Sequence, residues 1–173
     1  MTARDLERMA SELGLDAVGA TPAEPYEETE RHIRERQGRG LFADMKFTMA
    51  QPEVSCHPEK LLPGARTVVS AALCYYAPGS GPEPGEGRLP RYTWTDAYAV
   101  LRERLDALGR RLGGGYRVLV DANQHVDREA AARAGVGRLP TSRRARLRGG
   151  GSLPARLRDG VPDARHEGAA RGG

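Results

Sequence analysis

Residues 117–137, RVLVDANQHVDREAAARAGVG, carry the strongest signal for the fold. Residues 118–120 form a short aliphatic run typical of a buried strand, and an acidic turn follows directly. Asp127 is placed to cap an alanine-rich helix that ends at a glycine. Because ligands of α/β sheets often bind beyond the carboxyl ends of strands, Asp121 and Asn123 are the first candidate site residues.

Further helices and strands are expected in the residues before this stretch. Apolar residues spaced three and four apart predict helices over residues 6–13 and 98–112. Residues 26–37 are rich in Glu and Arg and predict a solvated helix. A short strand is expected at residues 17–20, and the nearly continuous apolar run TVVSAALCYY at residues 67–76 predicts a central strand covered on both faces. The alternation predicts an α/β fold, or an α+β fold with helices packed on a small sheet.

Three further segments carry weaker hints. Large apolar side chains between residues 42 and 49 fit either the core or the border of a ligand cavity. Residues 77–90 are rich in Gly and Pro and predict a long loop. Arg91 and Tyr92 lie beside Trp94, a grouping suited to stacking on a flat ligand; in the alternative interpretation, Trp94 anchors the next helix to the core.

Residues 138–173 form a basic tail that differs in composition from the rest of the chain. Nine of the 27 Lys and Arg residues lie there, against three of the 23 Asp and Glu residues, so the tail carries +6 and residues 1–137 carry −2. The tail has no aromatic residue and too few apolar residues to bury a core, which predicts disorder. Two other origins fit the same composition: an arginine-rich arm that binds RNA, or a GC-rich gene translated out of frame.

Cysteine and hydropathy patterns exclude several classes of protein. Cys56 and Cys74 are too few for a disulfide framework or a four-cysteine metal site, and no metal is expected at Cys56-His57 because adjacent residues rarely converge on one ion. No run of 18 apolar residues exists, and the amino terminus resembles an amphipathic helix rather than a signal peptide. We expect a cytoplasmic protein without membrane contact. The sequence gives no signal for an oligomeric state.

Several blocks, in this order, resemble a known family. LLPGARTVVSAALCYY, the loop leading to RYTW, the helix that follows and above all VDANQHVDREAAARAGVG are similar to the amino-terminal, cobalamin-binding domain of epoxyqueuosine reductase. The resemblance covers residues 1–137, which we treat as a partial domain of that kind. It implies a nitroreductase-like, corrinoid-binding sandwich, incomplete here and followed by the disordered tail.

The resemblance also implies a reaction and site residues. In the family, base-off cobalamin is reduced through two [4Fe-4S] clusters and removes the epoxide oxygen of epoxyqueuosine in tRNA, giving queuosine. Asp121 would then be the acid that protonates the leaving oxygen. Arg128, Asn123 and His125 would contact the corrin, as would Arg91 and Tyr92.

Simpler roles remain open for these residues. Asp121 could only brace the loop, Arg128 could form a surface ion pair with Glu129, and His125 could be an ordinary exposed loop histidine.

The chain also departs from the family pattern. Gly137 runs directly into Arg138-Leu139-Pro140, where the family continues with further sheet, and no cysteine follows Cys74, so the chain cannot ligate a [4Fe-4S] cluster by itself. We therefore expect a truncated or frameshifted relative that is inactive as this polypeptide. A separate electron donor protein is a candidate partner. The alternatives are a non-catalytic corrinoid-binding module and a basic-tailed RNA-associating protein.

Overall fold

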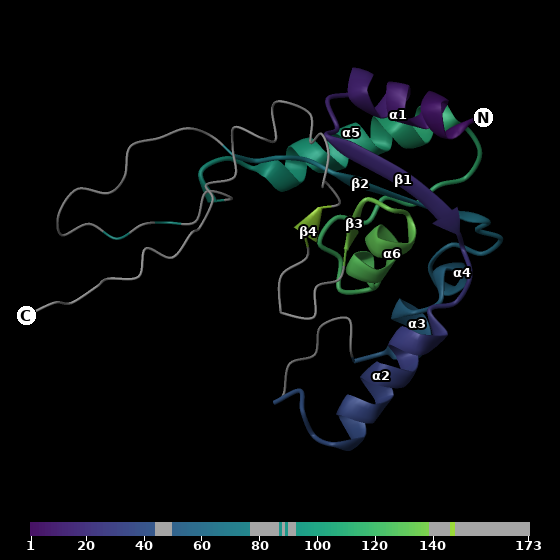
Figure 1. The fold of residues 1–173 in the computed structure, drawn as a ribbon, viewed down its shortest axis with the longest axis vertical. Helices are drawn as coiled ribbons and strands as arrows, with labels where there is room; N and C mark the ends of the chain where they lie inside the picture. The colour runs from purple at the N-terminus through teal and green to yellow at the C-terminus, as the bar shows by residue number, and fades with distance from the viewer. Residues whose placement is uncertain (44–49, 77–86, 88, 90–92, 139–145, 148–173) are drawn as a thin grey trace, which may run out of the picture.

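In a computed structural model of the protein, helices lie on both sides of a small antiparallel sheet (Figure 1). The structure describes residues 1–43, 50–76, 87, 89, 93–138 and 146–147. The elements in chain order are α1 (Ala3–Glu12), β1 (Ala17–Pro22), α2 (Glu27–Gly38), α3 (Pro52–Ser55), α4 (Pro58–Leu61), β2 (Thr67–Ala72), α5 (Ala97–Leu112), α6 (Asp127–Arg133), β3 (Gly137–Arg138) and β4 (Arg146–Leu147).

The sheet pairs β1 with β2 and separates two layers of helix. Its register runs from Ala17 opposite Ala72 to Pro22 opposite Thr67. Side chains alternate between the faces of a strand, so one face packs against α1 and α5, while the other faces α6. Gly19 is on the α6 face, where a Cβ atom would lie only 2.1 Å from the carbonyl oxygen of Ala134. The absence of a side chain at this position therefore lets the end of α6 lie directly on β1.

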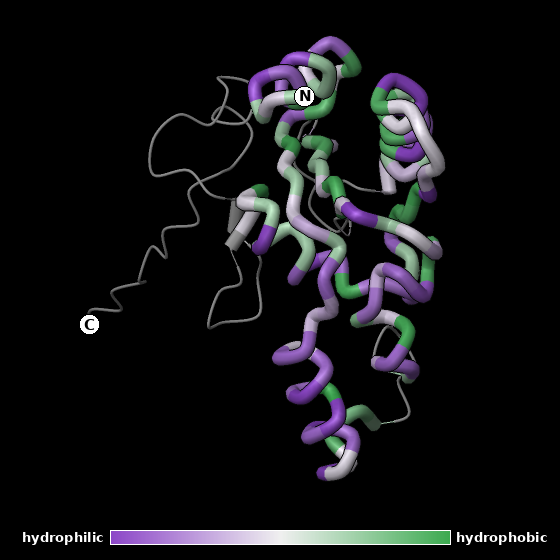
Figure 2. Tube along the Cα trace, turned by 90° about the vertical axis from the view of Figure 1, so that its right-hand side faces the viewer, coloured by the Kyte–Doolittle hydropathy of each residue, from purple (hydrophilic) through white to green (hydrophobic). Residues whose placement is uncertain are grey.

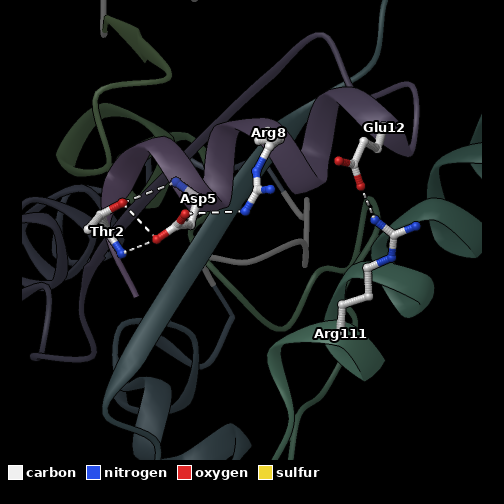
Figure 3. Close-up of polar contacts among 5 residues, drawn as sticks. All are labelled: Thr2, Asp5, Arg8, Glu12 and Arg111. Atoms are coloured by element: carbon white, nitrogen blue, oxygen red, sulfur yellow. Dashed lines mark hydrogen bonds and ion pairs between the residues drawn. The ribbon is translucent and has the colours of Figure 1, made fainter.

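The α1–α5 layer combines an apolar contact with polar ties. Leu6, Ala10, Leu15 and Leu108 form its buried cluster. A capping box at Thr2 and Asp5 begins α1, since each side chain bonds to the other residue's backbone N–H (Figure 3). At the other end of α1, the guanidinium of Arg111 donates to Glu12 at 2.7 Å, which joins α1 to α5 (Figure 3).

A second core cluster lies where α2, α3 and α6 meet. Its buried members are Tyr26, Ile33, Cys56, Val126 and Ala130. α2 itself is mostly hydrophilic along the tube of Figure 2, where it forms the lowest helix. Only Ile33 of this helix is buried, and most of the other α2 residues are exposed, as the sequence predicts.

Five predicted elements are confirmed: the helices over residues 6–13, 26–37 and 98–112, the alanine-rich helix at Asp127, and the strand at residues 17–20. Residues 118–120, in contrast, form no strand, since no described residue pairs with them in a ladder, although Val120 is buried. The sheet is antiparallel, which fits the α+β form of the expected fold rather than the α/β form.

Two predictions about the ends of elements are wrong. β2 stops at Ala72 rather than Tyr76. Within the described ranges it pairs with β1 alone, so its place at the centre of a sheet stays a prediction. Asp127 is not the cap of α6: the N-cap is Val126, and Asp127 is the first helical residue, where its carboxylate still favours the helix dipole.

Some expectations fall on residues outside the described ranges. These include Met45, Phe47 and Met49, nearly all of the loop at 77–90, and both Arg91 and Tyr92. Of the tail, the structure describes Arg138, which ends β3, and the two residues of β4; the two strands pair antiparallel. None of the helices in the described ranges combines the length and apolarity that crossing a bilayer requires.

Candidate functional site

The candidate site is built on the Asp121 loop, which we define as residues 121–126, between the extended segment after α5 and the start of α6. Asp121 is exposed and has φ of 47°, in the left-handed region. This conformation costs a residue with a side chain about 1 kcal/mol, although Asp and Asn tolerate it better than most. Strained residues of this kind concentrate at functional sites, which makes Asp121 a candidate on geometry as well as on position.

Hydrogen bonds hold the carboxyl-terminal part of the Asp121 loop. The N–H of Val126 donates to the carbonyl of Ser55 at 3.2 Å, and the N–H of His125 donates to Ala122 at 3.3 Å within the loop. Before the loop, the guanidinium of Arg117 donates to the Leu61 carbonyl at 2.8 Å and to the Gln124 side chain at 2.6 Å. The loop is therefore fixed to the α3–α4 segment, while Asp121 points into open space at its beginning.

His125 is buried rather than exposed, with 7% of its surface accessible. Its ring meets the Tyr26 ring edge-to-face, with centroids 5.4 Å apart. Among the described residues, neither the Nε2 atom of His125 nor the Tyr26 hydroxyl has a hydrogen-bond partner. Burial lowers the pKa of His125 below its ordinary value of 6.5, because removal from water disfavours the charged ring.

The remaining predicted site residues of the loop region face solvent. Asn123 and Arg128 are both exposed. The ion pair considered for Arg128 is not formed, because Glu129 bonds instead to Arg133 at 3.2 Å. Within the described part of the chain, the Arg128 guanidinium makes no hydrogen bond or ion pair, so it is available to a ligand.

Residues that sequence reasoning did not single out complete this region. The guanidinium carbon of Arg133 lies 4.3 Å from the centre of the Tyr26 ring and holds it from the outer side. Glu30 accepts from His57 Nε2 at 2.7 Å and from Arg34 at 2.6 Å, which ties α2 to the residue before α4. Glu30 and His57 are 27 positions apart, so no local sequence pattern reveals that they pair. Tyr26 could have been identified as a core residue from the sequence, since it is a large aromatic residue directly before a run of charged residues.

Two surface hollows lie near the site without including it. One, of about 740 Å³, is bordered by charged residues of the β1–α2 connection, by α2 and by Arg133. The other, of about 410 Å³, is bordered by His57, Lys60 and neighbouring prolines. Neither hollow is lined by Asp121, so the candidate site is marked by the strained backbone of the loop and not by a pocket. In the described ranges, no group of three His, Cys, Asp or Glu residues is placed to hold a metal ion.

Comparison with known proteins gives one consistent family. Residues 56–128 match the family model "Epoxyqueuosine reductase QueG, DUF1730". The epoxyqueuosine reductase of Synechococcus sp. (strain CC9605) is 35% identical over 76% of this chain and 43% of its own length. That of Bacillus cereus is 30% identical over 78% of this chain and 38% of its own length. This chain thus spans about two fifths of the length of these curated relatives.

Solved structures agree with the sequence comparison. A selenomethionine-labelled epoxyqueuosine reductase superposes with a TM-score of 0.67 at 26% identity, over 78% of this chain and 38% of that chain. The enzyme of Streptococcus thermophilus gives a TM-score of 0.66 at 26% identity, over 79% and 40%. An epoxyqueuosine reductase with an epoxyqueuosine-modified tRNA-Tyr stem loop gives 0.60 at 25% identity, over 78% and 38%.

Proposed function

We propose that this chain, which is similar to epoxyqueuosine reductases over most of its length, uses its Asp121 loop to supply the proton in the reduction of epoxyqueuosine to queuosine in tRNA. The observation that carries the proposal is the state of Asp121: an exposed carboxyl group, held in a left-handed backbone conformation on a loop whose far end is anchored at Gln124 and Val126. A group fixed in this way needs little rearrangement to meet a substrate.

The proposed chemistry requires Asp121 to hold and release one proton. Removal of an epoxide oxygen takes two electrons and two protons and releases water. When the first C–O bond breaks, the oxygen stays on the neighbouring carbon, gains negative charge and must be protonated to a hydroxyl group before the second C–O bond can break. A carboxyl group keeps its proton near neutral pH only where its surroundings disfavour the charged form. Because Asp121 is exposed in this chain, we propose that bound substrate and cofactor cover it and provide that environment.

Cobalamin, when bound, would supply the reducing power at the face of the site. The exposed surface beside Asp121 fits such a group, because the guanidinium of Arg128, which has no partner among the described residues, and the amide of Asn123 can bond to the amide side chains that surround a corrin ring. His125 does not share this surface, since its ring is turned into the core. Arg91 and Tyr92 remain proposed contacts.

Iron–sulfur clusters do not fit this chain. A cubane cluster uses four thiolate ligands, and the sequence holds two cysteines, of which Cys56 is fully buried. We propose that electrons come from outside these 173 residues and that the chain alone is inactive without a reductant. A tRNA substrate would place the protein in the cytoplasm.

The test separates binding from proton donation. The purified chain would be mixed with cobalamin, and a change in the corrin absorption spectrum would report binding; an epoxyqueuosine stem loop and a titanium(III) reductant would then be added and the nucleoside products measured by mass spectrometry. We expect Asp121→Asn to bind the corrinoid normally but to lose turnover about 100-fold or more. Asp127→Asn, a matched change six positions away, is expected to retain it. Unchanged turnover of Asp121→Asn would refute the role of Asp121.

A second candidate function follows from the charge of the tail. Residues 138–173 carry +6, so the chain could associate with RNA without catalysis. In this case tRNA binding would weaken steeply with salt and disappear on deletion of the tail, while no corrin spectrum would develop.

A further inference from the structure

His125 occupies an unusual place for a histidine beside a candidate site. It belongs to the Asp121 loop, yet its ring is buried while the residues before it, Asn123 and Gln124, are exposed. The contact with Tyr26 joins the loop to the beginning of α2, far away in sequence. Its side chain is therefore the inward-facing anchor of the loop.

The buried environment of His125 suits only the neutral form of its ring. Within the described residues no acceptor lies near Nε2, so protonation would place an unpaired charged N–H group in the core. Burying a charge without a partner costs several kcal/mol, whereas a neutral ring leaves at most one polar atom unsatisfied. Acid would thus favour a loop in which His125 has moved into water.

The neighbouring groups do not compensate for such a charge. From α6, the Asp127 carboxylate favours the charged ring, but the effect of burial is larger and the pKa of His125 is lowered overall. From the start of α2, Tyr26 presents its ring, and the burial of its hydroxyl raises the pKa of Tyr26, so it stays neutral. From the end of α3, burial likewise keeps the Cys56 thiol neutral. Arg133 lies over the Tyr26 ring and is paired with Glu129 at 3.2 Å, so its charge already has a partner.

We propose that His125 is a positioning residue: its uncharged ring, packed on Tyr26, holds the Asp121 loop closed, and protonation of the ring releases the loop and with it Asp121. The significance of the released carboxyl group rests on the proposed function; the closing and opening of the loop do not. In the closed form, the bond from the Val126 N–H to Ser55 reports the state of the loop.

The sign of the pH effect follows from the lowered pKa. Between 6.5 and the pKa of the closed form, the open loop binds more protons than the closed loop. Each unit of pH below about 6.5 therefore reduces the ratio of closed to open loop, by up to tenfold, until the pKa of the closed form is reached. Above about 7 the ratio is expected to be constant.

The experiment is amide hydrogen exchange of the 173-residue chain between pH 5 and 7.5, corrected for the intrinsic exchange rate. We expect the protection of Val126 to fall as the pH falls below 6.5, and the His125 ring signals in NMR to follow the same midpoint. His125→Leu keeps an apolar side chain of similar size and is expected to give protection that is independent of pH. His125→Gln, also uncharged, provides the same comparison if the leucine variant does not fold. Tyr26→Phe retains the ring contact and is expected to keep the wild-type pH dependence.

Two results would overturn this proposal. One is protection of Val126 in the wild-type chain that does not change with pH. The other is a pH dependence that persists unchanged in the uncharged variants, which would assign the titration to another group such as Asp127. Neither depends on corrinoid or tRNA, so they leave the role of Asp121 in proton donation standing. Conversely, full turnover by Asp121→Asn would remove that role and leave the pH dependence of the loop intact.

Discussion

Substitution of Gly19 by alanine tests the packing that positions the site. Gly19 lies on the face of β1 that contacts the end of α6, and α6 begins directly after the Asp121 loop. A methyl group at this position would point at the backbone of Ala134, which cannot rotate away as a side chain can. The change therefore acts on the contact between the sheet and α6 rather than on a flexible surface group.

The size of the effect follows from the distance. The new Cβ would lie 2.1 Å from the Ala134 oxygen, whereas ordinary contacts begin at 3.4 Å, so the end of α6 must move by about 1.3 Å. Overpacking of this kind costs about 1–3 kcal/mol. Alanine recovers about 0.5–1 kcal/mol through the lower entropy of the unfolded chain. We expect Gly19→Ala to lower the free energy of unfolding by about 1–2 kcal/mol.

Urea unfolding followed by circular dichroism measures this difference. Gly38→Ala is the matched control, because a Cβ there would meet nothing within 4 Å and the residue ends α2. We expect the control to be neutral or stabilising by up to about 1 kcal/mol. If Gly19→Ala unfolds at the same urea concentration as Gly38→Ala, with the same slope, the close approach of α6 to β1 does not exist in solution.

Two further predictions concern the polar ties and the thiols. His57 and then Arg34 lower the pKa of the Glu30 carboxyl below its ordinary 4.5, so Glu30→Gln should cost about 0.5–1 kcal/mol at pH 7. In urea unfolding, the difference from wild type should fade as the pH falls through the lowered pKa; a difference that is constant down to pH 3 would contradict the pairing. Burial raises the pKa of the Cys56 thiol, so iodoacetamide at pH 8 should alkylate the half-buried Cys74 first in the native chain, and both at similar rates in urea. Mass spectrometry that finds Cys56 modified as fast as Cys74 in the native chain would refute this burial.

The helices were predictable because their signals are local. In α5, the spacing of leucines and the glycines that follow it fix both ends, and Gly113 has the positive φ of 75° that such an ending requires. In α1, the start is encoded by Thr2 and Asp5, three residues apart. Signals for helix ends lie within a few residues of those ends, so they can be read from the sequence without knowledge of the fold.

Strand assignments failed where pairing decides the outcome. Residues 118–120 have the composition of a strand, but a strand exists only through its neighbours, and the described residues provide none. The end of β2 at Ala72 is set in the same way, because Ala72 pairs with Ala17, where β1 begins. A sequence pattern shows that a segment suits a sheet and does not show how many neighbours it has.

The candidate site was predictable in part. Asp121 was identified from its place after an apolar run and from the family resemblance, while its strained backbone is visible only in the structure. His125 was expected at the surface or on a ligand, and its burial depends on Tyr26, about 100 positions earlier in the chain. Contacts of this range depend on how the whole chain is folded, which a local pattern does not contain.

The register of β1 and β2 has a consequence for how the molecule assembles during synthesis. Ala17 pairs with Ala72 and Pro22 with Thr67, so β1 and β2 of a nascent chain cannot pair fully until about seventy residues have left the ribosome tunnel. The second face of the β1–β2 sheet is covered by α6, which is synthesised later still. Before α6 packs, α1 is stabilised locally by its capping box. The apolar faces of β1 and β2 are then exposed to chaperones and proteases.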